Sequence, residues 1–190
     1  MLFRSTTLLS GNYYNYLVKK WDIQTGSFIQ DFTGAPGYIL SIVFSPDGLY
    51  AYSAGGGNTI KKWDMQTGLS VLDITGHGWT VNAMAITPDN RYLVSVSNDQ
   101  TIRQWHTVNG TELRSWTISG YYSTLVTVTS DSMFAFVFTE DYRLRQLNLM
   151  NGAVNRTIQM CCAAQGAYSM VDRKSTRLNS IHTDISRMPS

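Results

Sequence analysis

Residues 19–26 read KKWDIQTG and residues 61–68 read KKWDMQTG, so the two stretches differ at one position and lie 42 residues apart. The same step leads to RQWHTVNG at 103–110 and to RQLNLMNG at 145–152. Each stretch begins with a basic residue and ends with glycine. A period of about 20–50 residues is typical of repeat proteins, in which each unit is one small supersecondary structure. The chain therefore contains an internal repeat of 42 residues.

A second column, made of turn residues, keeps the same step. It reads FSPDG at 44–48, ITPDN at 86–90 and VTSDS at 128–132. Pro and Asp favour tight reversals of the chain, and the runs beside these turns, such as YILSIVF and LYAYSA, are rich in aromatic and β-branched residues. Strands of about 5–6 residues with frequent turn signals indicate an all-β fold. We expect four short strands in each unit.

Several motifs inside the period resemble those of the WD-repeat β-propeller family. The stretch GHGWTVNAMAITPDNRYLVSVSNDQTIRQWH at 76–106 shows them most clearly, 34–64 matches nearly as well, and 118–148 is a weaker third unit. The resemblance covers about residues 9–171. It implies four-stranded antiparallel blades arranged radially around an axis. Three full units with partial ends cannot close a ring of about seven blades, so we expect residues 1–171 to form an incomplete propeller.

Four residues of the clearest unit contain the residue types of a Ser-His-Asp triad: His77, Ser95 or Ser97, Asp99 and Trp105. A catalytic triad needs an exposed, activated hydroxyl, and no Gly-x-Ser-x-Gly turn surrounds either serine. The family resemblance implies instead a buried hydrogen-bond chain. Such a chain gives a tryptophan N–H its acceptor and a carboxylate its donors. We expect His77, Ser95, Asp99 and Trp105 to form a structural tetrad.

The neighbouring units lack part of this set. In the preceding unit Ala35 stands in place of the histidine and Gly57 in place of the aspartate. In the following unit Ser119 replaces the histidine and Leu147 replaces the tryptophan. We expect these two units to depend on packing instead of the tetrad.

Aromatic residues in the loops that enter the first strand of a unit are candidates for protein binding. Trp79, Tyr121 and Tyr122 hold such positions, and in the family these loops edge one mouth of the propeller. Exposed amphipathic aromatic side chains are good binding anchors. The alternative is that they pack between blades as part of the core.

The charge of the chain gives no sign of a nucleic-acid partner. The net charge is +2, and residues 172–190 account for all of it. One basic residue recurs in every unit and can form a basic arc or, as we favour, lay its aliphatic stem along neighbouring strands; these residues are Lys19, Lys61, Arg103 and Arg145. We expect no nucleic-acid binding.

The cysteines and the apolar runs give weaker indications. Cys161 and Cys162 are adjacent and are the only two cysteines, which fits reduced thiols in a strand and offers no zinc site. No apolar run approaches the length of a membrane span, and the N-terminal stretch lacks the apolar core of a signal peptide. We expect a cytoplasmic or nuclear protein with no cofactor, no metal and no membrane partner.

The last segment, DRKSTRLNSIHTDISRMPS at 172–190, departs from the period. It has no apolar periodicity, and it resembles an in-frame translation of a sequencing-library adapter, whose bases GAT CGG AAG AGC encode Asp-Arg-Lys-Ser. We expect this tail to be non-native, the alternative being a genuine disordered terminus, and we leave it out of functional reasoning. An incomplete propeller exposes strand edges and blade faces, so we expect the isolated chain to self-associate through them.

The sequence favours a non-catalytic scaffold for protein–protein interaction, because repeats tolerate loop variation on a rigid stack. One alternative is a sensor or regulatory repeat domain of a larger enzyme, signalling NTPase or kinase. Another is ligand binding in the axial channel of a closed ring. The sequence does not name the partner or the total number of blades.

Overall fold

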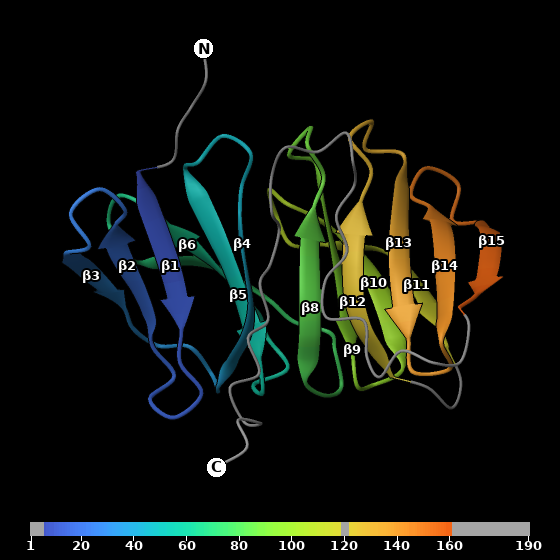
Figure 1. Cartoon of the computed structure of the whole chain (residues 1–190), viewed down its shortest axis with the longest axis horizontal. Helices are drawn as coiled ribbons and strands as arrows, with labels where there is room; N and C mark the ends of the chain where they lie inside the picture. The colour runs from blue at the N-terminus through green and yellow to red at the C-terminus, as the bar shows by residue number, and fades with distance from the viewer. Residues whose placement is uncertain (1–5, 119–121, 161–190) are drawn as a thin grey trace.

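The computed structural model describes residues 6–118 and 122–160, and within these ranges every regular element is a β-strand. Fifteen strands form four antiparallel sheets in this part of the chain, and the sheets stand side by side across the molecule (Figure 1). Three of the sheets have four strands, and the first has three described strands. The prediction of an all-β fold with four-stranded antiparallel blades at a 42-residue spacing is confirmed.

Within each sheet, the strands follow one another in chain order. The first sheet contains β1 (Thr7–Gly11), β2 (Val18–Asp22) and β3 (Phe28–Phe32). The second contains β4 (Ile39–Phe44), β5 (Tyr50–Gly55), β6 (Ile60–Asp64) and β7 (Ser70–Ile74). The third contains β8 (Val81–Ile86), β9 (Tyr92–Ser97), β10 (Thr101–His106) and β11 (Glu112–Thr117). The fourth contains β12 (Ser123–Val128), β13 (Phe134–Thr139), β14 (Arg143–Asn148) and β15 (Val154–Gln159).

The sequence unit and the sheet are offset by one strand. Strands β3, β7 and β11 follow the glycine that ends each repeated stretch. They nevertheless pair with β2, β6 and β10, the strands that precede that glycine, and complete the same sheet. Unit 34–64 therefore contributes β4, β5 and β6 to the second sheet, and the fourth strand of that sheet comes from the next period. Because of this offset, every period contributes strands to two neighbouring sheets.

The sheets pack face to face, and each interface is a cluster of buried apolar residues. Between the first and second sheets, the rings of Phe32 and Trp63 meet edge to face with their centroids 5.9 Å apart. Between the second and third sheets, Ile74 and Trp105 belong to one buried cluster. A middle sheet is covered on both faces, which is why a run such as YILSIVF is apolar except for Ser41 instead of alternating with polar residues.

At the third interface the tryptophan has moved to the opposite sheet. Leu147 of β14 stands where Trp63 and Trp105 stand in their sheets, and the residue that packs beside it is Trp116 of β11. The large ring thus comes from the upstream sheet, and its Nε1 donates to the carbonyl of Gly152 at 2.7 Å. Exchanging a large and a small side chain across an interface keeps the total volume of the core nearly unchanged.

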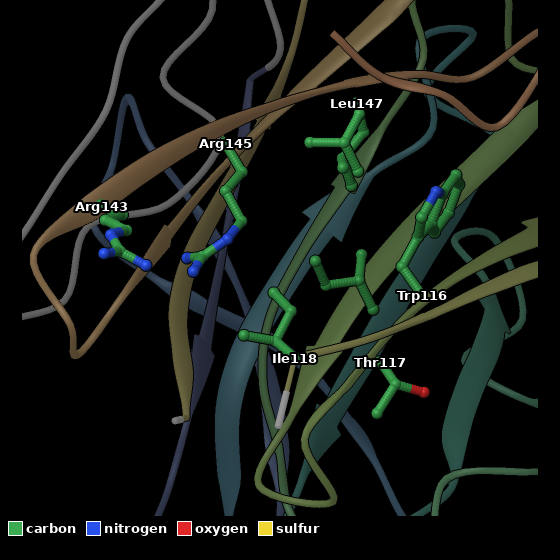
Figure 2. A pocket seen from close by; sticks show the side chains of 8 residues that line it. Trp116, Thr117, Ile118, Arg143, Arg145 and Leu147 are labelled. Atoms are coloured by element: carbon green, nitrogen blue, oxygen red, sulfur yellow. The ribbon is translucent and has the colours of Figure 1, made fainter. Parts of the chain in front are cut away.

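A cleft of about 360 Å³ remains beside this pair, between the third and fourth sheets (Figure 2). Apolar side chains from both sheets line it, and Arg143 and Arg145 approach it from β14. None of the four residues of the predicted tetrad lines this cleft.

Candidate functional site

The loops that connect successive sheets lie at one end of the molecule, the lower end in Figure 1. The β1–β2 turn of the first sheet lies at the same end, as do the turns between the second and third strands of the other three sheets. We call this end the loop face. Its described segments are residues 12–17, 33–38, 56–59, 75–80, 98–100 and 140–142 together with Tyr122. All of the predicted site residues that the structure describes lie on this face or directly beneath it.

The structure brings His77, Ser95, Asp99 and Trp105 together beneath the loop face. The indole N–H of Trp105 donates to Ser95 Oγ at 2.8 Å, and this oxygen lies 2.6 Å from His77 Nε2. His77 Nδ1 lies 2.8 Å from Asp99 Oδ2. The four side chains join loop 75–80 to strands β9 and β10 and to the turn at 98–100. Ser97, the alternative serine, does not belong to this hydrogen-bonded set, and its hydroxyl donates to the carbonyl of Trp79 at 3.2 Å.

The protonation states follow from burial and from hydrogen bonding. Burial lowers the pKa of His77, whose side chain is 1% exposed, so the imidazole is neutral near pH 7. Burial alone would raise the pKa of Asp99, but hydrogen bonds from Thr101, from the Gly78 N–H and from His77 outweigh it and bring this pKa to about 2. A neutral His77 therefore donates from Nδ1 to the Asp99 carboxylate and accepts the Ser95 hydroxyl proton at Nε2.

The distances within this set are those of a Ser-His-Asp triad, but its surroundings do not suit catalysis. Ser95 is 0% exposed, and its Oγ already accepts the Trp105 N–H. A nucleophile has to reach the substrate, with stabilising donors close to the reacting atom. The cleft of Figure 2 is lined by none of the four residues. What the arrangement can do is hold a loop and a turn together.

The second sheet joins the equivalent loop and turn by packing on glycines. The ring of Tyr38 lies on Gly56, where a Cβ would come within 2.3 Å of the Tyr38 ring, and Pro36 lies on Gly57 in the same way at 2.4 Å. The replacement of Asp by Gly57 thus makes room for the loop, as expected for a unit that depends on packing. Trp63 keeps its acceptor, because its Nε1 donates to Ser53 Oγ at 2.8 Å.

The fourth sheet lacks the complete tetrad and adds to its packing an ion pair that the sequence did not predict. Asp141 occupies the place of Asp99, and the Arg145 guanidinium lies 2.6 Å from its Oδ2. Burial would raise the pKa of Asp141, but hydrogen bonds from Arg145 and Thr139 and the charge of Arg145 bring it to about 2. Val137 and Leu147 replace the Ser–Trp pair, and both are buried. Ser119 lies outside the described residues.

The four recurring basic residues each pair with an acidic residue. Such pairs leave no row of free cations along the sheets, and their stems lie along the strands. The pairs are Lys19–Asp31 at 2.8 Å, Lys61–Asp73 at 2.7 Å, Arg103–Glu112 at 2.5 Å and Arg145–Asp141 at 2.6 Å.

The aromatic residues predicted on the loops are exposed where they are described. Trp79 is 59% exposed and Tyr122 is 41% exposed, whereas Tyr121 lies outside the described residues. Sequence reasoning missed Tyr13, Tyr14 and Tyr16, which are also exposed on the loop face, in segment 12–17. The stretch NYYNYL, with Asn at turn positions between tyrosines, was the signal that could have found them.

Residues 6–118 and 122–160 contain no group of three or more His, Cys, Asp or Glu side chains placed to hold a metal ion. These ranges also contain no helix that is long and apolar enough to cross a membrane.

The stretches that match a known protein family are spaced by the same 42-residue period. Residues 26–64 and 68–106 match the family model described as WD domain, G-beta repeat. The chain carries WD repeats. In the structure, the first WD repeat spans β3 to β6 and the second spans β7 to β10, so each includes the last strand of one sheet and three strands of the next. No curated protein matches the chain.

WD repeats indicate a domain for protein interaction, and their family is generally non-catalytic. The weaker unit at 118–148 lies outside the two matched ranges. Its strands nevertheless join a sheet with the same order as those of the matched WD repeats. The lost tryptophan and the Asp141–Arg145 pair are differences in side chains on the same backbone plan.

Proposed function

We propose that this WD-repeat array is a non-catalytic scaffold that binds other proteins through its loop face. The observation that carries the proposal is the gathering of exposed aromatic side chains at this one end, including Trp79 and Tyr122. Large amphipathic rings bury much surface at a low entropic cost, which makes them effective anchors. The second and third sheets beneath them are packed on both faces and give the loops a rigid base.

In this proposal the tetrad is a structural support for the loop face. His77 and Asp99 hold loop 75–80, which presents Trp79, against the turn at 98–100. Ser95 and Trp105 anchor the other end of this chain of hydrogen bonds in the core. The loop is therefore tied to the sheet as well as to the turn at 98–100. The tetrad thus reduces the ordering cost that a free loop would have on binding.

The test places a photo-crosslinking amino acid on the full chain and illuminates it in a lysate. Introduced at Trp79 or Tyr122, the probe should give discrete protein adducts. Introduced at Val108, which is exposed at the opposite end of the sheets, it should give far fewer. Equal adducts from both ends, or none from the loop face, would refute a scaffold that acts through this face.

A second proposal concerns self-association of the isolated chain through the outer face of the first sheet. Leu8 pairs with Trp21 in β1 and β2 and is 54% exposed, whereas the residues in its place in the later sheets, such as Leu93 opposite Trp105, are fully buried. Ile23, one residue after the Trp-Asp pair, is 57% exposed. An apolar face that is buried in every other sheet favours association when it is open.

Sedimentation analysis over a range of concentrations tests this. The wild-type chain should form larger species as its concentration rises, and Leu8→Glu should shift the distribution toward monomer. Leu69→Glu, at another exposed leucine on a turn, is the control and should not. A monomeric wild type at every concentration would exclude the second proposal.

A further inference from the structure

Part of the loop face carries five aromatic side chains on neighbouring loops, which we call the tyrosine platform: Tyr13, Tyr14 and Tyr16 of segment 12–17, Tyr38 of segment 33–38 and Trp79 of segment 75–80. Tyr14 is 88% exposed, and Tyr13, Tyr16 and Trp79 are exposed as well. Isolated surface aromatics are ordinary, but several on adjoining loops are typical of a binding surface.

Direct contacts join the parts of the platform. The rings of Tyr13 and Tyr38 stack with centroids 4.4 Å apart at an interplanar angle of 25°, and Tyr14 meets Tyr13 edge to face at 5.5 Å. The Tyr38 hydroxyl lies 3.2 Å from Thr80 Oγ1, beside Trp79. Ring contacts therefore join the first sheet to the loop that enters the second, and the Tyr38 hydroxyl reaches the loop that enters the third.

The backbone under these rings is fixed by hydrogen bonds before any ligand arrives. Asn12 Oδ1 accepts the N–H of Tyr14 at 2.6 Å and that of Asn15 at 3.2 Å, while Asn15 Oδ1 accepts the N–H of Leu17 at 3.2 Å. Tyr38 is seated on Gly56, so its ring has little freedom. A surface ordered in this way has less entropy to lose when a ligand binds.

The platform carries no charge of its own. Segments 12–17, 33–38, 56–59 and 75–80 contain no Lys, Arg, Asp or Glu. Of the basic residues on the strands below, Lys19 pairs with Asp31 and Lys61 with Asp73, whereas Lys20 and Lys62 donate to the carbonyls of Met65 and Thr107, at the end of the sheets opposite the loop face. A charged peptide would therefore give up hydration here without gaining an opposite charge.

We propose that the tyrosine platform binds an uncharged, proline-rich segment of a partner protein in the polyproline II conformation. Proline rings pack on aromatic faces, and a polyproline II helix is already extended and ordered, so binding it has a small entropic cost. Proline has no N–H and offers only carbonyl acceptors, which match the hydroxyl and indole donors at the edges of Tyr and Trp rings. Uncharged donors on rigid aromatic rings, without ionic groups, are the chemistry that such a segment requires.

This inference rests on the proposed role of the loop face in protein binding and names the class of segment that the face recognises. The test measures the fluorescence anisotropy of a labelled, uncharged proline-rich peptide titrated with the full chain. Tyr14→Ala and Trp79→Ala should each weaken binding at least about fivefold, as expected for an interface anchor. Both side chains are exposed, so melting curves of these variants should match the wild type.

Phe28→Ala is the matched control, because Phe28 is an exposed aromatic at the start of β3, at the end of the sheet opposite the loop face. It should change the affinity less than about twofold, within the range of a near-neutral position. No peptide binding by the wild type, equal losses in all three variants, or binding of a neutral oligosaccharide in place of the peptide would each overturn the inference.

The crosslinking experiment separates this inference from the broader proposal. Adducts from Trp79 or Tyr122 in a chain that ignores the peptide would refute the polyproline II ligand and leave the scaffold role standing. Peptide binding that depends on Tyr14, in a chain that gives no adducts, would support the platform and refute the scaffold role.

Discussion

Replacing Asp99 by alanine removes the acceptor on which the tetrad ends. The carboxylate accepts hydrogen bonds from His77 Nδ1 at 2.8 Å, from the Gly78 N–H at 2.8 Å and from the Thr101 N–H at 2.9 Å, besides one from the Thr101 hydroxyl. In Asp99→Ala these donors lose their partner, and His77 cannot turn to water because its side chain is 1% exposed.

The expected loss follows from how buried each donor is. In this variant the His77 N–H keeps only the Thr101 hydroxyl, 3.2 Å away, as an acceptor, and losing the shorter bond to a carboxylate costs about 1–3 kcal/mol. Gly78 and Thr101 lie closer to the surface, where water replaces the carboxylate, and together they add about 1 kcal/mol. We therefore expect the free energy of unfolding to fall by roughly 2–4 kcal/mol, which for a chain of this size lowers Tm by about 5–15 °C.

Thermal and urea unfolding, followed by circular dichroism, measure this loss, and Ser123→Ala is the control. Ser123 is also buried, but its Oγ has no hydrogen-bond partner among the described residues, so removing it should be neutral or slightly stabilising. A double-mutant cycle with His77→Ala should show coupling, since each variant breaks the same bond. Equal Tm losses in Asp99→Ala and Ser123→Ala would refute the structural role of the tetrad.

Three further predictions test other parts of the molecule. Because the pKa of His77 is lowered in the folded state, the unfolded chain takes up a proton first as pH falls below about 6.5. The free energy of unfolding, measured in urea, should therefore decline as the pH falls. His77→Gln should flatten that decline. Asp99, with a folded pKa of about 2, adds a second loss between about pH 4 and 2. Gly55→Ala puts a Cβ 1.8 Å from the Tyr38 carbonyl oxygen, whereas the Cβ of Gly78→Ala meets its nearest atom at 3.7 Å. In the same assay Gly55→Ala should lower the free energy of unfolding by about 3 kcal/mol, and Gly78→Ala by less than about 0.5 kcal/mol. Gln104 is buried with no partner for its amide among the described residues, so Gln104→Met should raise the urea midpoint by the equivalent of about 1 kcal/mol, and a clear drop would show that the amide is bonded.

The sequence alone determined the elements and the residue types of the tetrad. Turns and strands are set by neighbours within a few positions, so a 42-residue period in columns such as 19–26 and 44–48 was enough to indicate an all-β repeat. The same period showed where units 34–64 and 118–148 depart from the pattern, at Gly57 and Leu147. How the fold compensates for these departures did not follow from it.

Tertiary structure decided what lies across each interface. Trp116 packs against the cluster that contains Leu147 although 31 positions separate the two residues in the sequence, and only the packing of two sheets brings them to one interface. Likewise, the tyrosine platform gathers segments 12–17, 33–38 and 75–80, each of which reads as an ordinary loop. Short-range patterns specify turns and strands, whereas the filling of volume and the pairing of buried donors depend on residues brought together from distant parts of the chain.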